Sequence, residues 1–291
     1  MFVLYVDPFN YFGWFNGIPV NAKKEIVYRD DRIWWNTIEF SHSPSPYILI
    51  GDSRADLIST RHLLEKTGKR YMHLSASACK MNEMADLFWF ANSRTKLESV
   101  TIVVHFNVFN HYAFSDRVAG VEAVIRNPLL YLYNRHVIGT AVVIFKSVFS
   151  AGRTKRSGPP RDKAGFWAWS LEHWPEQQYG KWKYPAEGYE KLRRVSDFCH
   201  REKIRLTFII APSHVDYQKK AVQFGLGGEL IRFKKDISSL STTYDFDFAN
   251  DLTGNQENFK DPVHVKESVA DSLMDQILTG RLRDGRLLES R

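Results

Sequence analysis

Residues 47–56 set the expected architecture, and they read Tyr47-Ile48-Leu49-Ile50-Gly51-Asp52-Ser53-Arg54-Ala55-Asp56. The run before Gly51 is apolar, as expected for a strand buried on both faces of a parallel sheet. A helix is expected over residues 55–67. Ser53 would then lie on the turn at the carboxyl end of the strand, which is the edge where open α/β sheets bind ligands.

Ser53 has two interpretations. It is a cap of the following helix, since Ser and Asp are preferred N-cap residues, and on this stretch alone the cap is favoured. Alternatively, Ser53 is a nucleophile placed where the free N–H groups of a helix N-terminus favour a developing negative charge.

A second stretch near the C-terminus favours the nucleophile, and it reads Phe259-Lys260-Asp261-Pro262-Val263-His264. A nucleophilic serine needs a base, and the base needs a group that orients it. Asp261 and His264 are close enough in sequence for one short turn to present both side chains. We therefore expect Ser53, His264 and Asp261 to converge at the carboxyl edge of the sheet.

The pair of motifs, Gly-Asp-Ser after the first strand and Asp-x-x-His near the C-terminus, resembles the SGNH (GDSL-type) hydrolase superfamily over roughly residues 47–280. The resemblance implies a three-layer α/β/α, flavodoxin-like parallel sheet and an esterase or acyltransferase. It also implies that Ser53 attacks an acyl carbonyl, that His264 accepts the proton, and that Asp261 orients His264.

An oxyanion hole is implied by the same resemblance, formed by N–H groups of Ser53 and of a residue after the second strand, and by an Asn amide. The family usually has glycine after the second strand; here Ala78 is expected in that position. Asn107 follows the third strand, but His105 occupies the place of the glycine in Gly-x-Asn. Asn110 is a nearby alternative, and an Asn after a strand is also a common turn residue.

Apolar runs along the chain predict further strands, and the last of them alternates like an edge strand; the expected strands are 47–50, 70–74, 100–104, 204–210 and 244–248. Helical patterns separate the runs, so the sequence predicts a doubly wound α/β sheet. His214 follows the fourth of these strands. It is either a second site histidine that binds substrate or a structural turn residue.

We expect three parts of the chain. They are an N-terminal arm over residues 1–44, an SGNH hydrolase-like domain over residues 45–280 with an insertion at residues 116–184, and a charged, frayed tail over residues 281–291. The apolar residues 1–6 are the end of a membrane anchor, a first strand or a packing arm. The insertion is rich in aromatic residues. Its Trp167 and Trp169 are candidates for stacking on sugar rings, and the alternative is an aromatic minicore.

Composition limits the remaining options. The chain has 291 residues and a formal charge of +7, and it has no nucleic-acid motif, so we expect no nucleic-acid partner. No Cys/His cluster has metal spacing, and neither a metal nor another cofactor is expected. Cys79 and Cys199 are buried thiols or one disulfide. No run is long enough for a transmembrane helix, and the oligomeric state stays open.

The substrate expectation rests on resemblance to bacterial envelope members of the superfamily, such as the alginate O-acetyltransferase group. They resemble this chain in the Asp-Pro-Phe-Asn-Tyr-Phe arm, Gly-Asp-Ser-Arg, the aromatic insertion and a late Asn-Phe-x-Asp-x-x-His. The resemblance implies acyl, chiefly acetyl, esters of a cell-envelope polysaccharide, with Arg54 as a substrate-binding candidate. A periplasmic-face location is expected if an anchor precedes residue 1, and a cytoplasmic one otherwise. The alternatives are a catalytically silent glycan-binding or assembly protein and a cytoplasmic esterase for small esters.

Overall fold

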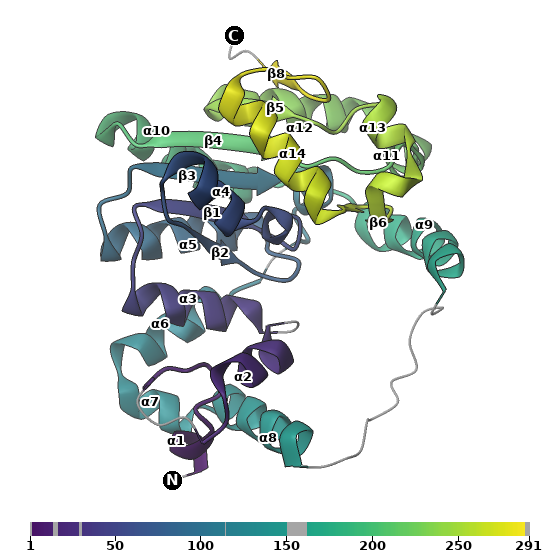
Figure 1. Cartoon of the computed structure of the whole chain (residues 1–291). Coiled ribbons are helices and arrows are strands. Elements are labelled where there is room, and N and C mark those ends of the chain that lie inside the picture. Colours follow the sequence, from purple (N-terminus) through teal and green to yellow (C-terminus); the bar gives the residue numbers. More distant parts are fainter. Residues whose placement is uncertain (1, 14–16, 29–30, 114, 150–161, 289–291) are drawn as a thin grey trace.

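The structure, a computed structural model, describes residues 2–13, 17–28, 31–113, 115–149 and 162–288 (Figure 1). Residues 150–161 of the predicted insertion, residues 289–291 of the predicted tail and residue 1 lie outside this part.

A six-stranded sheet forms the centre of the molecule, with the order β2-β1-β3-β4-β5-β8. Its strands are β1 (Tyr47–Gly51), β2 (Tyr71–Ser75), β3 (Ser99–Val104), β4 (Arg205–Ile210), β5 (Thr242–Asp245) and β8 (Arg286–Leu288). All neighbours pair in parallel except β5 and β8. The order 2-1-3-4-5 is that of the flavodoxin-like sheet, so the predicted fold class is confirmed.

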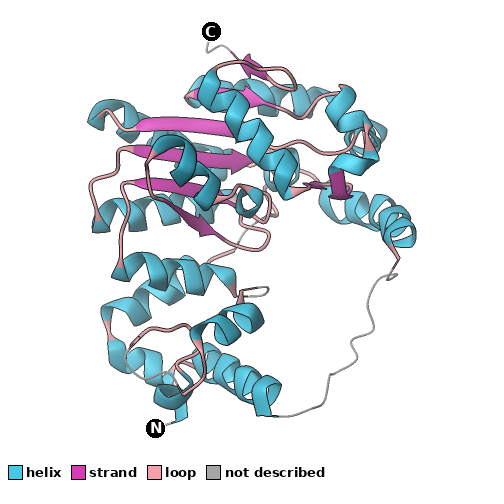
Figure 2. Cartoon of the chain, viewed as in Figure 1, coloured by secondary structure: helices cyan, strands magenta, loops and turns pink. Residues whose placement is uncertain are grey.

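Both faces of this sheet are covered, because alternate residues of each strand enter two separate hydrophobic cores. Ile48 and Ile50 belong to one core, whereas Leu49 belongs to the other. The first core is closed by α5 (Met81–Arg94), α10 (Ala186–Glu202) and α12 (Gly227–Leu240); the second is closed by α4 (Thr60–Thr67) and α14 (Glu267–Thr279). Figure 2 shows the strands between helices. The continuous apolar runs in the sequence reflect this burial on both faces.

The N-terminal arm is helical, although its sequence has weak helix signals. It contains α1 (Phe2–Val6), α2 (Val20–Val27) and α3 (Arg32–His42). The structure thus contradicts the first-strand option for residues 1–6. Helix α3 packs on β2, while α1 and α2 contact α8 (Arg135–Phe149). Asp7 fixes the arm by accepting hydrogen bonds from the Tyr131 hydroxyl, at 2.9 Å, and from the Tyr11 N–H, at 2.8 Å.

The predicted insertion divides between two places. Helices α6 (Val118–Arg126), α7 (Pro128–Tyr133) and α8 lie beside the arm at the bottom of Figure 1. Helix α9 (Lys163–Tyr179) instead packs against α11 (Val215–Gln223) and the small β6 strand (Phe259–Asp261). Among the described helices, none combines the length and apolarity that crossing a membrane requires.

Several local expectations were wrong. The helix expected over 55–67 is interrupted: a short η1 (Ala55–Leu57) precedes α4, and Ser59, not Ser53, caps α4. Strand β5 is not an edge strand, because β8, within the segment expected to be a frayed tail, pairs with it. Cys79 and Cys199 are free and buried, which excludes the disulfide between them.

The remaining short elements lie near the carboxyl edge of the sheet. They are η2 (Phe106–Val108), α13 (Asp251–Gly254), η3 (Gln256–Asn258) and β7 (His264–Val265), which forms a hairpin with β6.

Candidate active site

The turn after β1 places Ser53 at the carboxyl edge of the sheet. A Cβ on Gly51 would lie 2.8 Å from the Ala55 Cβ and 2.9 Å from the Val103 carbonyl oxygen, so close packing requires glycine there. After Gly51 the chain turns, with the Ala55 N–H bonded to the Asp52 carbonyl at 3.0 Å. Ser53 lies on this turn and is half-buried.

Asp52 and His105 form a buried pair beneath the turn. The His105 Nε2 lies 2.7 Å from the Asp52 Oδ2, and the other carboxylate oxygen accepts the Arg54 N–H at 2.9 Å. Burial alone would raise the pKa of Asp52, but the charges and hydrogen bonds of His105 and Arg54 hold it well below its usual range. Burial lowers the pKa of His105, as does the Arg54 charge, against the influence of Asp52. His105, which donates from Nε2 to the Asp52 carboxylate, therefore fixes the Ser53 turn from the end of β3.

The β6–β7 hairpin presents Asp261 and His264 together. Asp261 Oδ1 accepts the N–H groups of Val263, at 2.9 Å, and of His264, at 3.0 Å, which closes a tight Asx turn. Asp261 Oδ2 lies 2.8 Å from the His264 Nδ1. The other ring nitrogen, Nε2, lies 2.7 Å from the Ser53 Oγ. The three side chains thus form a continuous chain of contacts from a hydroxyl to a carboxylate.

The environment of Asp261 keeps it ionised. Burial would raise its pKa, but the hydrogen bond and charge of His264, together with the backbone N–H groups of Val263 and His264, outweigh burial and lower it. A carboxylate in this position holds the Nδ1–H tautomer of His264 and leaves Nε2 free to accept a proton.

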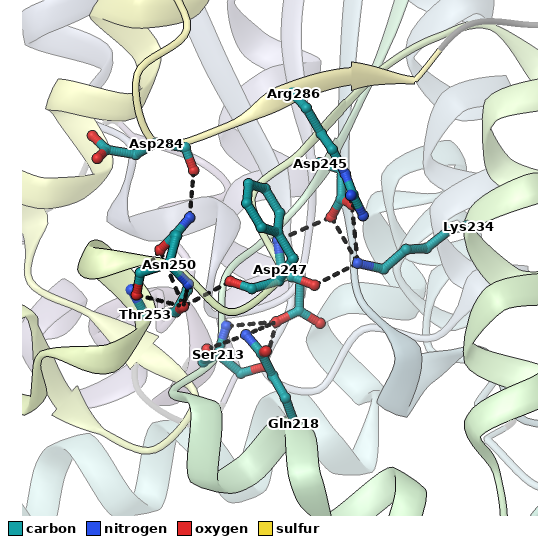
Figure 3. A network of polar contacts seen from close by, with 10 residues as sticks. Ser213, Gln218, Lys234, Asp245, Asp247, Asn250, Thr253, Asp284 and Arg286 are labelled. Carbon is teal, nitrogen blue, oxygen red and sulfur yellow. Dashed lines mark hydrogen bonds and ion pairs between the residues drawn. The ribbon is translucent and has the colours of Figure 1, made fainter.

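A polar network joins the segment after β4 to the end of β5 and to β8 (Figure 3). Asp245 at the end of β5 binds Lys234 and Arg286, and Asp247 accepts the Ser213 N–H at 2.9 Å and hydroxyl at 2.6 Å. Next along the chain, the His214 N–H donates to the Pro262 carbonyl at 2.9 Å. The network therefore ties the end of β4 to β5 and, through His214, to the hairpin.

His214 and Trp167 lie behind the hairpin, outside the cleft. The His214 ring is buried, meets Trp167 edge-to-face at 4.9 Å between centroids, and accepts the Asp216 N–H through Nδ1 at 3.3 Å. His214 has the geometry of a structural turn residue at the start of α11.

The cleft in front of Ser53 has a volume of about 690 Å³, which includes space open to solvent. It is lined by Asp52, Ser53, Arg54, Ala78, Lys80, His105, Asn107, Val108, Trp174, Gln177, Gln178, Val263 and His264. Trp169 does not belong to this lining; it stacks on His173 of its own helix, with ring centroids 4.7 Å apart.

Two N–H groups are available for an oxyanion. Within the described residues, no acceptor takes the Ser53 N–H or the Ala78 N–H. Ala78 has a φ of 50°, in the left-handed region that glycine adopts without strain. The backbone therefore has a glycine-like conformation at the position where the resemblance expects glycine.

Asn107 is held in one orientation by two tyrosines. Its Nδ2 donates to the Tyr217 hydroxyl at 3.2 Å, and its Oδ1 accepts the Tyr179 hydroxyl at 2.6 Å. Because Tyr217 in turn donates to Gln178 at 2.6 Å, the amide nitrogen of Asn107 is identified as the donor. The second N–H of this amide can donate to a group bound in the cleft. Asn110, the alternative, instead donates to the Gln178 carbonyl and lines a different cavity.

Sequence reasoning did not include Lys80, Gln177 or Gln178 among the site residues, although all three line the cleft; Trp174, one of the tryptophans expected to be able to stack on sugars, lines it too. Lys80 lies two residues after Ala78, so the expected position of the turn after β2 could have indicated it. The others come from α9, and no sequence pattern shows which side of that helix meets Ser53. Among the described residues, no group of His, Cys, Asp and Glu could hold a metal.

No protein-family model matches the chain, and no curated protein matches it either. Three solved structures align with most of it. A Streptococcus pneumonia protein provisionally described as a platelet activating factor has a TM-score of 0.46 and 8% identity, covering 89% of this chain and 96% of that chain.

A provisionally described acylhydrolase from Bacteroides fragilis has a TM-score of 0.39 and 11% identity, covering 84% of this chain and 95% of that one. A GDSL-like lipase from Bacteroides thetaiotaomicron has a TM-score of 0.41 and 9% identity, with coverages of 86% and 100%. By its own sheet order, and by the placement of Ser53, Asp261 and His264, the chain has the fold of the SGNH (GDSL-type) hydrolase superfamily.

Proposed function

We propose that the protein is a serine esterase or O-acyltransferase that acts on acyl, chiefly acetyl, esters of a bacterial cell-envelope polysaccharide. The observation that carries the proposal is the contact chain from the Ser53 Oγ through His264 to Asp261. That chain lies at an open cleft with two free N–H groups and a fixed Asn107 amide. The choice of a polysaccharide as substrate is supported by the resemblance to envelope members and by the open cleft, whose lining combines polar groups with Trp174.

In the first half of the reaction, the Ser53 Oγ attacks the acyl carbonyl carbon while His264 Nε2 takes the hydroxyl proton. The carbonyl oxygen becomes an oxyanion, which the N–H groups of Ser53 and Ala78 and the Asn107 amide stabilise. One such donor typically contributes about 3 kcal/mol to lowering the barrier. The carbon–oxygen bond to the alcohol then breaks, and the alcohol oxygen takes the proton from His264.

In the second half, water or a sugar hydroxyl attacks the acyl group on Ser53 and gives its proton to His264. Collapse of this second oxyanion breaks the bond to Ser53, which recovers its proton from His264. Water produces hydrolysis and a sugar hydroxyl produces transfer, so the occupant of the cleft in this step determines which reaction occurs.

The test measures hydrolysis of p-nitrophenyl acetate and of an acetylated polysaccharide, together with labelling by a fluorophosphonate probe. Wild type should turn over both esters and take the label at Ser53, and Ser53→Ala should lose both properties. Ser239→Ala is a matched control, since Ser239 is exposed on α12 and hydrogen-bonds to the Asp236 carbonyl and the Tyr189 hydroxyl, neither of which lines the cleft. A wild type that is neither labelled nor active would support the catalytically silent alternative. Turnover of small esters without the polysaccharide would favour the small-ester esterase.

A further inference from the structure

Arg54 is a largely buried cation whose guanidinium has no direct contact partner among the described residues, although the charge of the Asp52 carboxylate acts on it. Its residue is 6% exposed, yet its guanidinium makes no hydrogen bond and no ion pair with any described residue. The hydrogen bonds of Arg54 come from its backbone: the N–H donates to Asp52, and the carbonyl accepts the Leu57 N–H. Arginine is almost never fully buried unless it is paired, and a buried charge without a partner costs free energy.

Other buried charges in this protein do have partners. Glu83 binds Arg117 at 2.7 Å, and Asp245 binds Lys234 at 3.0 Å and Arg286 at 2.7 Å. Arg54 is therefore an exception that needs a physical reason.

The position of Arg54 indicates where a partner for its guanidinium could bind. Arg54 follows the nucleophile in the chain and lines the cleft together with Ser53 and His264. It also lines an apolar cavity between α14 and the sheet, where Leu273, Met274 and Ile209 can offer it no acceptor. Of these two surroundings, the cleft is the one that presents polar groups to Arg54.

The cleft lining is electropositive near the nucleophile. It contains Lys80 in addition to Arg54, and Asp52 is its one carboxylate. Both oxygens of Asp52 are already bound, to His105 and to the Arg54 N–H. An anion that entered the cleft would meet two cations without displacing an existing ion pair.

We propose that Arg54 binds an anionic group, a carboxylate or a phosphate, that the substrate carries next to the reacting ester. This inference rests on the proposed function and names its substrate class: acyl esters of acidic or phosphorylated sugars. The planar guanidinium offers paired donors that match both groups, and Lys80 adds a second positive charge. Arg54 acts here as a specificity residue, since it binds a part of the substrate that does not react.

The experiment compares three acetylated methyl glycosides that differ at one position: a neutral glucoside, a glucuronoside that carries a carboxylate, and a glucoside 6-phosphate. We expect wild type to show a kcat/KM at least tenfold higher for one or both charged esters, mainly through a lower KM. The carboxylate and phosphate arms distinguish the two sources of negative charge.

Arg54→Gln should reduce the preference for charged over neutral ester about ten- to hundredfold, the range of a hydrogen-bonded charge. Arg54→Lys should restore part of it. Arg61→Gln, which removes an exposed arginine of α4, is the matched control and should keep the wild-type preference. As a measurement without a variant, unacetylated methyl glucuronoside or methyl glucoside 6-phosphate should inhibit hydrolysis of the neutral ester competitively.

The inference is overturned if wild type shows no preference for either charged ester. It is also overturned if Arg54→Gln lowers kcat/KM for all three esters equally, because Arg54 would then support the turn or the oxyanion. Absence of turnover with every ester would instead contradict the proposed function itself.

Discussion

The Ser53 Oγ lies 2.7 Å from the His264 Nε2, although 211 positions separate these residues in the chain. Two turns create the contact: the sharp turn after Gly51 and the β6–β7 hairpin closed by Asp261. Each turn is fixed from behind by polar groups, the first by His105 and the second by the backbone of His214. The site geometry thus depends on residues that do not touch a substrate.

Asp261→Asn tests the orienting role of the carboxylate. The amide cannot hold the same tautomer of His264, so kcat should fall by about 10²- to 10⁴-fold, while KM changes little. Steady-state kinetics on an acetyl ester measure both constants. Asp251→Asn, at an exposed position of α13, should behave as wild type. A kcat for Asp261→Asn that equals the wild-type value would remove Asp261 from the mechanism.

Ala78→Gly tests the strained turn after β2. The left-handed conformation costs a non-glycine residue about 1–2 kcal/mol, and glycine avoids this while losing about 0.5–1 kcal/mol in chain entropy. We expect the free energy of unfolding to rise by up to about 1 kcal/mol, with ester hydrolysis retained. Ala123→Gly in the exposed face of α6 should instead cost about 1 kcal/mol. Denaturant titration separates the two, and equal losses in both variants would contradict the strain argument.

Glu83→Gln tests the ion pair that supports the same turn. Arg117 donates to Glu83 at 2.7 Å and to the Ser77 carbonyl at 3.1 Å. Loss of the carboxylate should cost about 2–3 kcal/mol; this is less than for a fully buried pair, because the Arg117 side chain is 32% exposed. Glu65→Gln, which breaks an exposed pair with Arg61, should cost at most about 0.5 kcal/mol.

The same pair has a defined pH dependence. Burial would raise the pKa of Glu83, but the hydrogen bond and charge of Arg117 outweigh burial and lower it. A lowered pKa means that the stabilisation is present above the unfolded-state pKa of about 4.3 and is lost as pH falls through the folded-state value. The stability gap between wild type and Glu83→Gln should therefore be constant near pH 7 and shrink below about pH 4. A stability difference between the two proteins that widens in acid would show that folding does not lower the pKa of Glu83.

Much of the sheet could be predicted from the sequence because burial on both faces leaves continuous apolar runs such as Ile48–Ile50. The proximity of Ser53, Asp261 and His264 could also be predicted, because their motifs lie at turns that the sequence indicates. Strand β8 was missed because it forms by pairing with β5, which is distant in the sequence. The charged residues of this segment have no apolar pattern that would predict a strand. The interruption after Leu57 was missed for a similar reason, since Ser59 and Ser53 are equally good caps in sequence.

Three tryptophans of α9 have different surroundings, which the sequence alone could not separate. Trp167 is buried against His214 and Phe259, so Trp167→Ala should cost about 3–5 kcal/mol of stability. Trp169 is half-buried and contacts rings of its own helix: Phe166 at 6.1 Å, His173 at 4.7 Å and Trp174 at 6.4 Å between centroids. Its replacement by Ala should therefore lower the Tm less than Trp167→Ala does.

Trp174 alone among the three lines the cleft, at the half-buried position expected of a ring that stacks on a sugar. Trp174→Ala should raise KM for an acetylated polysaccharide about two- to tenfold, the range of one aromatic stacking contact. KM for p-nitrophenyl acetate should change less, because that ester is too small to span the cleft. Tyr133→Ala, which removes an exposed aromatic ring of α7, serves as the matched control, measured by thermal melting and kinetics on the same samples. If Trp174→Ala lowers the Tm as much as Trp167→Ala while KM for the polysaccharide stays constant, Trp174 belongs to the core of the protein and the glycan contact must lie elsewhere.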